Sequence, residues 1–349
     1  MRVTWLALEW PRAGHHSGGV GRYVQRLAER TRDLVELTVV CFEGAVPMEG
    51  VRLVTLPAPR GRIDRYYGAA LRASRAIRRL QPDLVHSHGD DVLLPRDVPL
   101  VRTFHGSALG EARSSTGLRK LNHYVLAGLE SRSAARAART LAVGPEPFEL
   151  MRCDAILPPY AGVPRGERRP SATPSVVFIG SFEGRKQGRI AQEAVAALGG
   201  ERGEVALTVV GPADDAGSWA PWVDHRAGLS DDEVADAVRR AWVLVSPSAY
   251  EGFGIPVLEA LDHGLPVVAY PNPGSEYVRS LADGPVPLDL VSGAAFVEAL
   301  RRRLASGPEL SPAEQRAARR LVDGVLEAGS PARLLEHYEA AVRAARASA

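Results

Sequence analysis

Short apolar runs alternate with amphipathic segments along the first half of the chain. Uninterrupted apolar runs are typical of buried parallel strands, and apolar positions at helical spacing are typical of helices that bury one face. The first pattern predicts strands at 3–8, 37–42, 51–56, 84–88, 100–104, 140–143 and 155–157. The second predicts helices at 22–32, 66–80 and 122–138. Strands that alternate with helices form a parallel sheet covered on both faces, so this half predicts a doubly wound α/β domain.

The same alternation starts again after a polar join. Strands are predicted at 176–179, 206–210, 242–246 and 266–269, and helices at 188–198, 231–241, 255–263 and in two segments after 311. Ser230 precedes three acidic residues and is predicted to cap the helix 231–241. The join, 158–174, is rich in Pro, Gly and Arg. It therefore predicts a linker between two α/β domains, with a ligand cleft between them.

The composition is that of a globular protein with two domains. The chain has 349 residues, of which 45% are hydrophobic and 24% charged. No apolar stretch is long enough to cross a membrane as a helix. Two cysteines, Cys41 and Cys153, cannot form a disulfide framework, so we expect buried, reduced thiols in a cytoplasmic protein.

Charge is distributed unevenly along the chain. Residues 1–170 hold 26 Lys and Arg against 17 Asp and Glu, a net charge of +9, whereas residues 171–349 carry −7. A basic half favours an anionic acceptor or peripheral contact with an anionic membrane, at the inner face of the membrane for a cytoplasmic protein. The other interpretation is an Arg-rich surface that is simply solvated. No nucleic-acid partner is expected, because the chain lacks a basic run interleaved with aromatic residues.

The most informative stretch is 246–265, SPSAYEGFGIPVLEALDHGL. A strand ends before it, a loop with Glu251 and two glycines follows, and Pro256 suits the first turn of a helix. Free backbone N–H groups at that helix start form a site for an anion or for sugar hydroxyls. Glu259, one turn into the helix, can present its carboxylate on the same side as Glu251 and bind neighbouring hydroxyls. The alternative is structural, with Glu259 as a helix cap and Glu251 solvated, and the residues alone favour neither.

The motif EGFGIPVLE at 251–259 resembles the signature of family 4 retaining glycosyltransferases with the GT-B fold. Further stretches that resemble the family are 18–21, 82–88, 228–233, 246–248 and 264–268. The resemblance thus covers the chain from 1 to about 280. It implies two Rossmann-like domains facing each other across a cleft: an acceptor-binding domain at 1–163 and a donor-binding domain at 164–332. It also implies that a C-terminal helix at about 333–349 packs back on the first domain.

The resemblance implies roles for particular residues. Glu251 would bind hydroxyls of the transferred sugar, and Glu259 the ribose of the nucleotide. Arg185 and Lys186 would neutralise the diphosphate and the charge that grows on the leaving group. His105 would lie near the donor sugar. The remaining donor-binding positions are Gly18, Gly19, Gly180, Ser181, Leu229, Gly252, Phe253, Gly254 and Ile255.

Two positions depart from the family pattern. Ser181 stands where many members have Arg, and Gln187 stands where Gly is usual. The pair of Arg185 and Lys186 still follows Ser181 and directly precedes Gln187. The family as a rule needs no divalent cation, so the resemblance implies no metal and no cofactor. His86 and His88 alternate on one predicted strand and share a face, but no third ligand is identifiable and a metal site is rejected.

The implied reaction is transfer from a UDP- or GDP-sugar to a hydroxyl acceptor, with retention of anomeric configuration. The acceptor is unidentified: a glycan, a lipid-linked carrier or a small natural product. One alternative is a catalytically inactive module that binds sugar nucleotides, and another is a GT-B enzyme of epimerisation or phosphorolysis. A third is a dinucleotide-dependent oxidoreductase. This last one is disfavoured, because the glycines 18–21 begin ten residues after the first strand and Val24 stands where Gly or Ala belongs.

Overall fold

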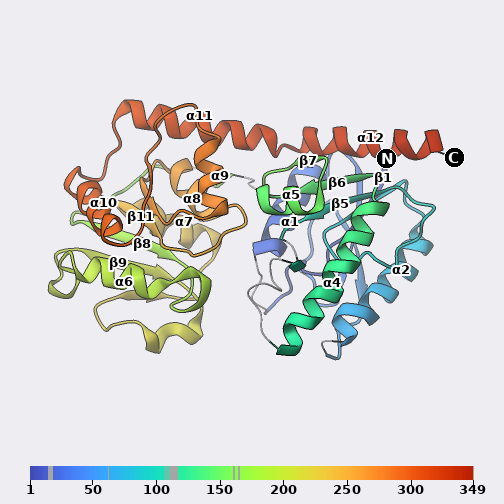
Figure 1. Cartoon of the computed structure of the whole chain (residues 1–349), viewed down its shortest axis with the longest axis horizontal. Helices are drawn as coiled ribbons and strands as arrows, with labels where there is room; N and C mark the ends of the chain where they lie inside the picture. The colour runs from blue at the N-terminus through green and yellow to red at the C-terminus, as the bar shows by residue number, and fades with distance from the viewer. Residues whose placement is uncertain are drawn as a thin grey trace. The chain divides into compact units, whose positions relative to one another are not determined.

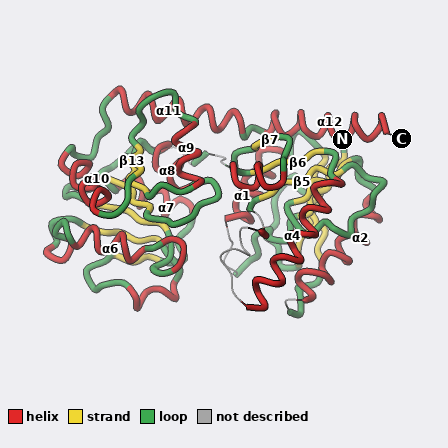
Figure 2. The backbone as a smooth tube through the Cα atoms, in the orientation of Figure 1, coloured by secondary structure: helices red, strands yellow, loops and turns green. Residues whose placement is uncertain are grey.

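The computed structural model of the chain is shown in Figure 1. It describes residues 1–14, 19–61, 63–106, 108–109, 117–159, 162–163 and 166–348. The backbone divides into two compact units, one made of residues 1–161 with 327–349 and the other of residues 162–326. In each unit the strands lie between helices (Figure 2).

The first unit is built on a seven-stranded parallel sheet of order β3-β2-β1-β4-β5-β6-β7. Its strands are β1 (Arg2–Leu6), β2 (Glu36–Phe42), β3 (Arg52–Leu56), β4 (Leu84–Ser87), β5 (Leu100–Phe104), β6 (Arg139–Ala142) and β7 (Ala155–Ile156). Its helices are α1 (Gly19–Thr31), α2 (Ala69–Leu80, after a π-helical turn at Asp64–Gly68), α4 (Gly117–Arg136), α5 (Pro145–Met151) and α12 (Pro331–Ser348). The chain order reverses between β1 and β4. Ligands of open α/β sheets bind at the carboxyl ends of the strands at such a reversal.

The predicted patterns explain these elements. Strands β2, β4 and β5 are buried along almost their whole length, as their continuous apolar runs predict. On α2 the small and apolar residues Ala69, Ala73 and Ile77 are buried, while its arginines lie on the other faces. Both cysteines are free and buried, as predicted. Burial raises the pKa of Cys41 to about 12 and that of Cys153 to about 11.

The C-terminal helix α12 packs on the sheet of the first unit. Leu334, Tyr338 and Ala341 are fully buried in one cluster with Trp5. The indole N–H of Trp5 donates a hydrogen bond to the hydroxyl of Tyr338 at 2.9 Å. Figure 1 shows α12 (red) ending close to the N-terminus. Residues from opposite ends of the chain thus complete one hydrophobic core.

Replacing Tyr338 by Phe is expected to destabilise the first unit by about 1–3 kcal/mol, because it leaves the buried indole N–H of Trp5 unpaired. Urea denaturation of the full chain measures this loss. The matched control is Tyr124→Phe, since Tyr124 on α4 is 47% exposed. It is expected to change stability by less than about 0.5 kcal/mol. Equal stability of Tyr338→Phe and wild type would contradict the assigned hydrogen bond.

The second unit is built on a six-stranded parallel sheet of order β10-β9-β8-β11-β12-β13. Its strands are β8 (Ser175–Ile179), β9 (Ala206–Val210), β10 (Asp224–Arg226), β11 (Val243–Ser246), β12 (Val267–Ala269) and β13 (Leu288–Leu290). Its helices are α6 (Gly188–Ala196), α7 (Asp231–Arg240), α8 (Ile255–Asp262), α9 (Pro273–Ser280), α10 (Ala294–Ala305) and α11 (Pro312–Ala328), with 3-10 turns at Gly184–Lys186, Gly200–Arg202 and Ala213–Ser218. Here the chain order reverses between β8 and β11.

Ser230 caps α7, as predicted. Its hydroxyl accepts a hydrogen bond from the backbone N–H of Glu233, whose carboxylate accepts one in return from the backbone N–H of Ser230. This reciprocal pair satisfies two of the free donors at the helix start.

The linker between the two units is shorter in the structure than the predicted range 158–174. The guanidinium of Arg168 donates to the carbonyl oxygens of Ala241 at 2.7 Å and Gly264 at 3.2 Å, and also to that of Pro308. The indole of Trp242 donates to the carbonyl of Ser171 at 2.9 Å. The prediction of a linker as far as 174 is therefore wrong for its last residues, which are bonded into the second unit. The Pro- and Arg-rich composition gave no sign of these bonds.

Candidate functional site

The reversal point of the second sheet brings together two loops that are far apart in sequence. One loop follows β8 and contains Gly180, Arg185 and Lys186. The other follows β11 and contains Glu251. The two strands are hydrogen-bonded neighbours, Val243 opposite Val176 and Val245 opposite Phe178, so their carboxyl ends meet at one edge of the sheet.

Glu251 joins both cations of the first loop. Its carboxylate accepts a hydrogen bond from Lys186 Nζ at 2.5 Å and one from an Arg185 guanidinium nitrogen at 3.0 Å. The same arginine nitrogen lies 3.2 Å from the carbonyl oxygen of Tyr250. A backbone bond of 2.9 Å from the Ala249 N–H to the Arg185 carbonyl fixes one loop on the other. The two loops therefore form one cluster of charges that are joined by hydrogen bonds.

The three charged groups differ in exposure. The Glu251 side chain is 10% exposed, that of Lys186 18% and that of Arg185 56%. Burial by itself would raise the pKa of Glu251, but the charge and hydrogen bond of Lys186, followed by the charge of Arg185, bring this pKa below its usual value. Glu251 is therefore an ionised carboxylate at neutral pH. The exposed guanidinium leaves donors available at the surface of the cluster.

Glycines fit tight places in both loops. A Cβ on Gly180 would lie 2.9 Å from Lys186 Cβ and Cγ, closer than side-chain carbons approach. Gly254 has a φ of +82°, a conformation that favours glycine, and it immediately precedes α8. Pro256 lies in the first turn of α8, as predicted. In the first turn Pro256 has no N–H, and the N–H of Val257 donates to the carbonyl oxygen of Gly254 at 3.0 Å.

The structure describes the burial or the contacts of the remaining predicted donor-binding residues of this unit. Phe253 is buried and packs edge-on against Tyr277, with ring centroids 5.8 Å apart, so its side chain anchors the loop. Ser181 donates to the carbonyl of Glu183 at 2.9 Å. Glu259 lies half-buried one turn into α8, and Leu229 lies half-buried between β10 and α7. Gly252 and Ile255 flank the loop and the helix start.

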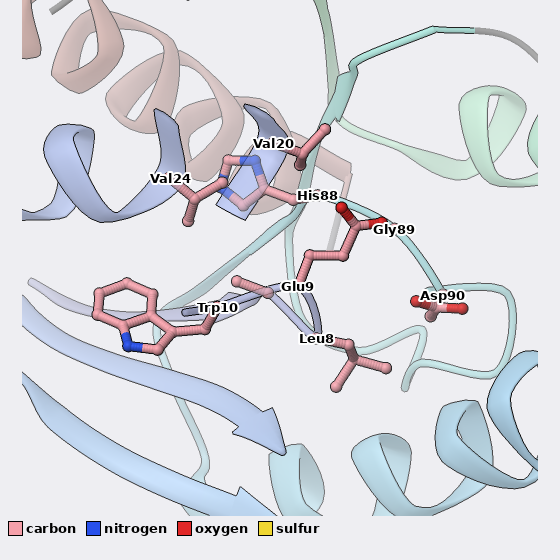
Figure 3. A pocket seen from close by; sticks show the side chains of 9 residues that line it. Leu8, Glu9, Trp10, Val20, Val24, His88, Gly89 and Asp90 are labelled. Atoms are coloured by element: carbon pink, nitrogen blue, oxygen red, sulfur yellow. The ribbon is translucent and has the colours of Figure 1, made fainter. Parts of the chain in front are cut away.

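A pocket lies at the reversal point of the first sheet, at the carboxyl ends of β1 and β4 (Figure 3). We call it the β1–β4 pocket. Its cavity volume is about 50 Å³, well below the range for sites that enclose a small molecule. It is lined by Ala7, Leu8, Glu9, Trp10, Val20, Val24, His88, Gly89 and Asp90. Glu9 and Asp90 were not among the predicted site residues, although Glu9 directly follows one predicted strand and Asp90 lies two positions after another, which was the signal that could have identified them.

His105 belongs to a group of three imidazoles beside this pocket. His88 Nδ1 lies 3.0 Å from His105 Nε2, at hydrogen-bond distance. The rings of His86 and His88 lie face to face at an angle, 4.3 Å apart, which confirms that they share a face. His86 makes hydrogen bonds through both nitrogens, at 2.7 Å with the Tyr338 hydroxyl and at 2.8 Å with Thr103 Oγ1. The hydroxyl of Tyr338 thus lies within hydrogen-bond distance of both Trp5 Nε1 and His86 Nδ1.

All three imidazoles are neutral at physiological pH. Burial, together with nearby groups that include Arg102, lowers the pKa of His86 to about 3. The same causes lower the pKa of His105 to about 3 and that of His88 well below its usual value. His105 can therefore donate or accept a hydrogen bond, but it carries no charge to offer a phosphate.

These histidines are expected to make the protein less stable in mild acid. An unfolded histidine has an ordinary pKa of 6.5, so between that pH and about 3 the unfolded chain binds protons that the folded rings exclude. The stability they provide is fully present above pH 6.5 and is lost as the pH falls towards 3. Urea denaturation between about pH 7.5 and 5 is expected to show this loss. The free energy of unfolding is expected to fall less steeply with decreasing pH in His105→Gln than in the wild type. The same slope in both proteins would contradict the neutral assignment.

The remaining predictions concern the two glycines before α1, a metal site and a membrane-spanning helix. Gly19 begins α1, whereas Gly18 lies outside the described residues. Among the described residues, no group of three or more His, Cys, Asp and Glu side chains is placed to share a metal ion. Within the same part of the chain, no helix is long and apolar enough to span a membrane.

Comparison with known proteins decides the family. The model of "Glycosyltransferase Family 4" matches residues 17–156, and that of "Glycosyl transferases group 1" matches residues 173–306. The chain belongs to the family 4, group 1 glycosyltransferases. The resemblance that the motif EGFGIPVLE carries is thereby confirmed, and each unit of the structure has its own matching model.

Individual glycosyltransferases are similar over nearly the whole chain. The 2-deoxystreptamine N-acetyl-D-glucosaminyltransferase of Streptomyces fradiae is 29% identical, over 95% of this chain and 93% of its own. The sucrose-phosphate synthase of Thermosynechococcus elongatus superposes with a TM-score of 0.74 at 17% identity, over 97% of this chain and 98% of its own. HepE of Anabaena, solved in complex with UDP-glucose, superposes with a TM-score of 0.64 at 14% identity, over 97% and 98%. These structural likenesses show the GT-B fold, with two Rossmann-like units, as predicted.

Proposed function

We propose that this glycosyltransferase moves a sugar from a UDP- or GDP-sugar to a hydroxyl of an acceptor, with retention of anomeric configuration and without a divalent cation. The observation that carries the proposal is the cluster of Glu251, Arg185 and Lys186 at the reversal point of the second sheet. Two cations held at that edge suit a diphosphate, and a buried ionised carboxylate between them suits sugar hydroxyls. In this proposal the second unit binds the donor and the first unit binds the acceptor.

The proposed step needs no nucleophile from the protein. The bond between the anomeric carbon and the diphosphate breaks, and its electron pair goes to the phosphate oxygen. The acceptor oxygen forms the new bond from the same face, and its proton passes to an oxygen of the leaving diphosphate. Arg185 and Lys186 stabilise the charge on the diphosphate, and Glu251 stabilises the positive charge on the sugar ring. Glu259 holds the ribose, while the neutral His105 donates to or accepts from the sugar.

Two findings on relatives support a nucleotide-sugar donor and a small acceptor. The GT-B protein HepE was solved in complex with UDP-glucose, which is a nucleotide sugar. The relative from Streptomyces fradiae is described as acting on 2-deoxystreptamine, a small natural product with two amino groups. We therefore place a small natural product ahead of a glycan or a lipid-linked carrier as the acceptor.

Peripheral membrane contact is a further part of the proposal. On α4 the apolar side chains of Leu121, Tyr124 and Val125 are exposed, between 47% and 62%, and Lys120 next to them is also exposed. Exposed apolar and basic side chains on one helix suit the surface of an anionic bilayer. Sedimentation with vesicles of an anionic phospholipid tests this part, and absence of co-sedimentation at low salt would remove it.

A thermal-shift experiment tests the donor class. The full chain is heated with UDP, GDP, dTDP, ADP or NAD, each with EDTA or with magnesium. A nucleotide at 100 times its dissociation constant adds about 2.7 kcal/mol to the stability of the unit that binds it. The proposal predicts a raised melting temperature with one nucleoside diphosphate, UDP or GDP, unchanged by magnesium. A shift with NAD alone would favour the oxidoreductase alternative and contradict the proposal.

A further inference from the structure

His88 lies next to His105 in the structure, although the two residues are 17 positions apart in the sequence. His88 directly follows β4, and His105 directly follows β5. The two strands are hydrogen-bonded neighbours, with Ser87 opposite Arg102, so their carboxyl ends meet at one edge of the sheet. There His88 Nδ1 and His105 Nε2 lie 3.0 Å apart. The function proposed above uses His105 and gives no part to His88.

The ring of His88 is held in place by the core of the first unit. The backbone N–H of His88 donates to the carbonyl oxygen of Leu6, the last residue of β1, at 3.0 Å. Its ring centroid lies 4.3 Å from that of His86 and 5.3 Å from that of Trp5. Both of these neighbours are fully buried. His88 Nδ1 therefore faces His105 from a well-defined position.

His105 is held through one ring nitrogen and keeps the other for a ligand. Its Nε2 faces His88 Nδ1, and its ring packs edge-on against the buried Tyr23 of α1, with centroids 5.5 Å apart. Among the residues that the structure describes, Nδ1 of His105 has no hydrogen-bond partner. His105 is also partly exposed. Nδ1 is therefore the nitrogen that can donate to a hydroxyl or accept from one.

We propose that His88 is a positioning residue for sugar transfer: its hydrogen bond to His105 Nε2 fixes the orientation of the His105 ring and leaves Nδ1 for a hydroxyl of the donor sugar. The inference rests on the proposed function, in which His105 contacts that sugar. Because a neutral imidazole carries one N–H, the protonation of His88 Nδ1 also determines whether His105 Nδ1 donates or accepts. Without this bond the His105 ring can turn about its side-chain torsions and present either nitrogen.

A double-mutant cycle in the full chain tests this inference, with release of nucleoside diphosphate from the donor as the readout. His88→Leu removes both ring nitrogens at similar volume, and it is expected to lower kcat/KM about tenfold, as for the loss of one hydrogen bond. In the His105→Gln background the same change is expected to lower kcat/KM by less than about twofold, because His88 acts through His105. His88→Asn keeps an amide group near the place of Nδ1 and is expected to recover most of the rate that His88→Leu loses.

The matched control is His337→Leu, which replaces a half-buried histidine on α12 of the same unit and is expected to leave kcat/KM unchanged within about a factor of two. A loss of the same size in both backgrounds would show that His88 only supports the fold, and it would overturn the inference. The full rate in His88→Leu or in His105→Gln would overturn it as well. Absence of donor cleavage by the wild type removes the proposed function, whereas cleavage that His88→Leu leaves unaffected removes this inference alone.

NMR spectroscopy of the wild type with ¹⁵N-labelled histidine tests the hydrogen bond without a substitution, in case His88→Leu does not fold. The ¹⁵N chemical shift of a ring nitrogen shows whether that nitrogen carries a proton. Of the two facing nitrogens, His88 Nδ1 and His105 Nε2, one is expected to be protonated and the other not. Two protonated or two unprotonated nitrogens would overturn the inference.

Discussion

Replacing Glu251 by Gln is expected to lower the rate of sugar transfer by about 10²- to 10³-fold. The variant keeps the shape of the side chain and removes its charge. That charge holds Lys186 Nζ at 2.5 Å and Arg185 at 3.0 Å, and in the proposed step it faces the positively charged sugar ring. The rate of nucleoside diphosphate release at saturating donor measures the loss.

Glu193→Gln is the matched control for this variant. Glu193 lies on α6 in the same unit, and its side chain is 63% exposed and forms a long surface pair with Arg189 at 3.9 Å. Its replacement is expected to leave the rate unchanged within a factor of two, because exposed pairs of this kind contribute about 0.2–0.5 kcal/mol. A Glu251→Gln variant that is folded by circular dichroism and keeps the full rate would contradict the role assigned to this carboxylate.

Replacing Lys186 by Met is expected to have the second large effect, a loss of transfer efficiency of about 10²-fold or more. Lys186 is the better shielded of the two cations, since 18% of its side chain is exposed against 56% for Arg185. Its charge is therefore less weakened by solvent. The loss is expected in the KM for the donor as well as in kcat, because the diphosphate carries charge before and after bond cleavage.

The same variant also tests the structure of the cluster. Loss of Lys186 leaves the buried carboxylate of Glu251 with Arg185 as its charged partner, so the melting temperature is expected to fall. The matched control is Arg189→Gln, a cation three positions further along that is 62% exposed. Unchanged donor KM and kcat in Lys186→Met would show that the diphosphate is bound elsewhere.

The parts of the fold that follow local patterns could be predicted from the sequence. Buried parallel strands are continuous apolar runs, so β2, β5 and β9 were predicted within a residue of their observed bounds. β10, β13, α9 and α10 were not predicted. The two strands are three residues long and two of the six residues are apolar, so no run marks them. They form strands because a neighbouring strand supplies the hydrogen bonds, which a local pattern does not encode.

The candidate site likewise combines local features that the sequence shows with long-range contacts that it does not show. The loop glycines, the first-turn proline and the charged residues are local features, and the sequence displays them directly. The ion pairs between Glu251 and the two cations span 65 and 66 positions, so they depend on which strands become neighbours. The bond between Tyr338 and His86 spans 252 positions. The acidic lining of the β1–β4 pocket was hidden by the basic composition around it, because the net charge of residues 1–170 averages over that whole half of the chain.

Cleavage of the donor tests the central claim most directly. The full chain is incubated in EDTA with UDP-glucose, UDP-N-acetylglucosamine, GDP-mannose and dTDP-glucose in turn, with a panel of small natural products as acceptors. Released nucleoside diphosphate is quantified, and proton NMR gives the anomeric configuration of the product. The account predicts that one UDP- or GDP-sugar is cleaved without metal and that the product keeps the donor's configuration. An inverted product, or a nucleotide that binds while every donor stays intact, would contradict it.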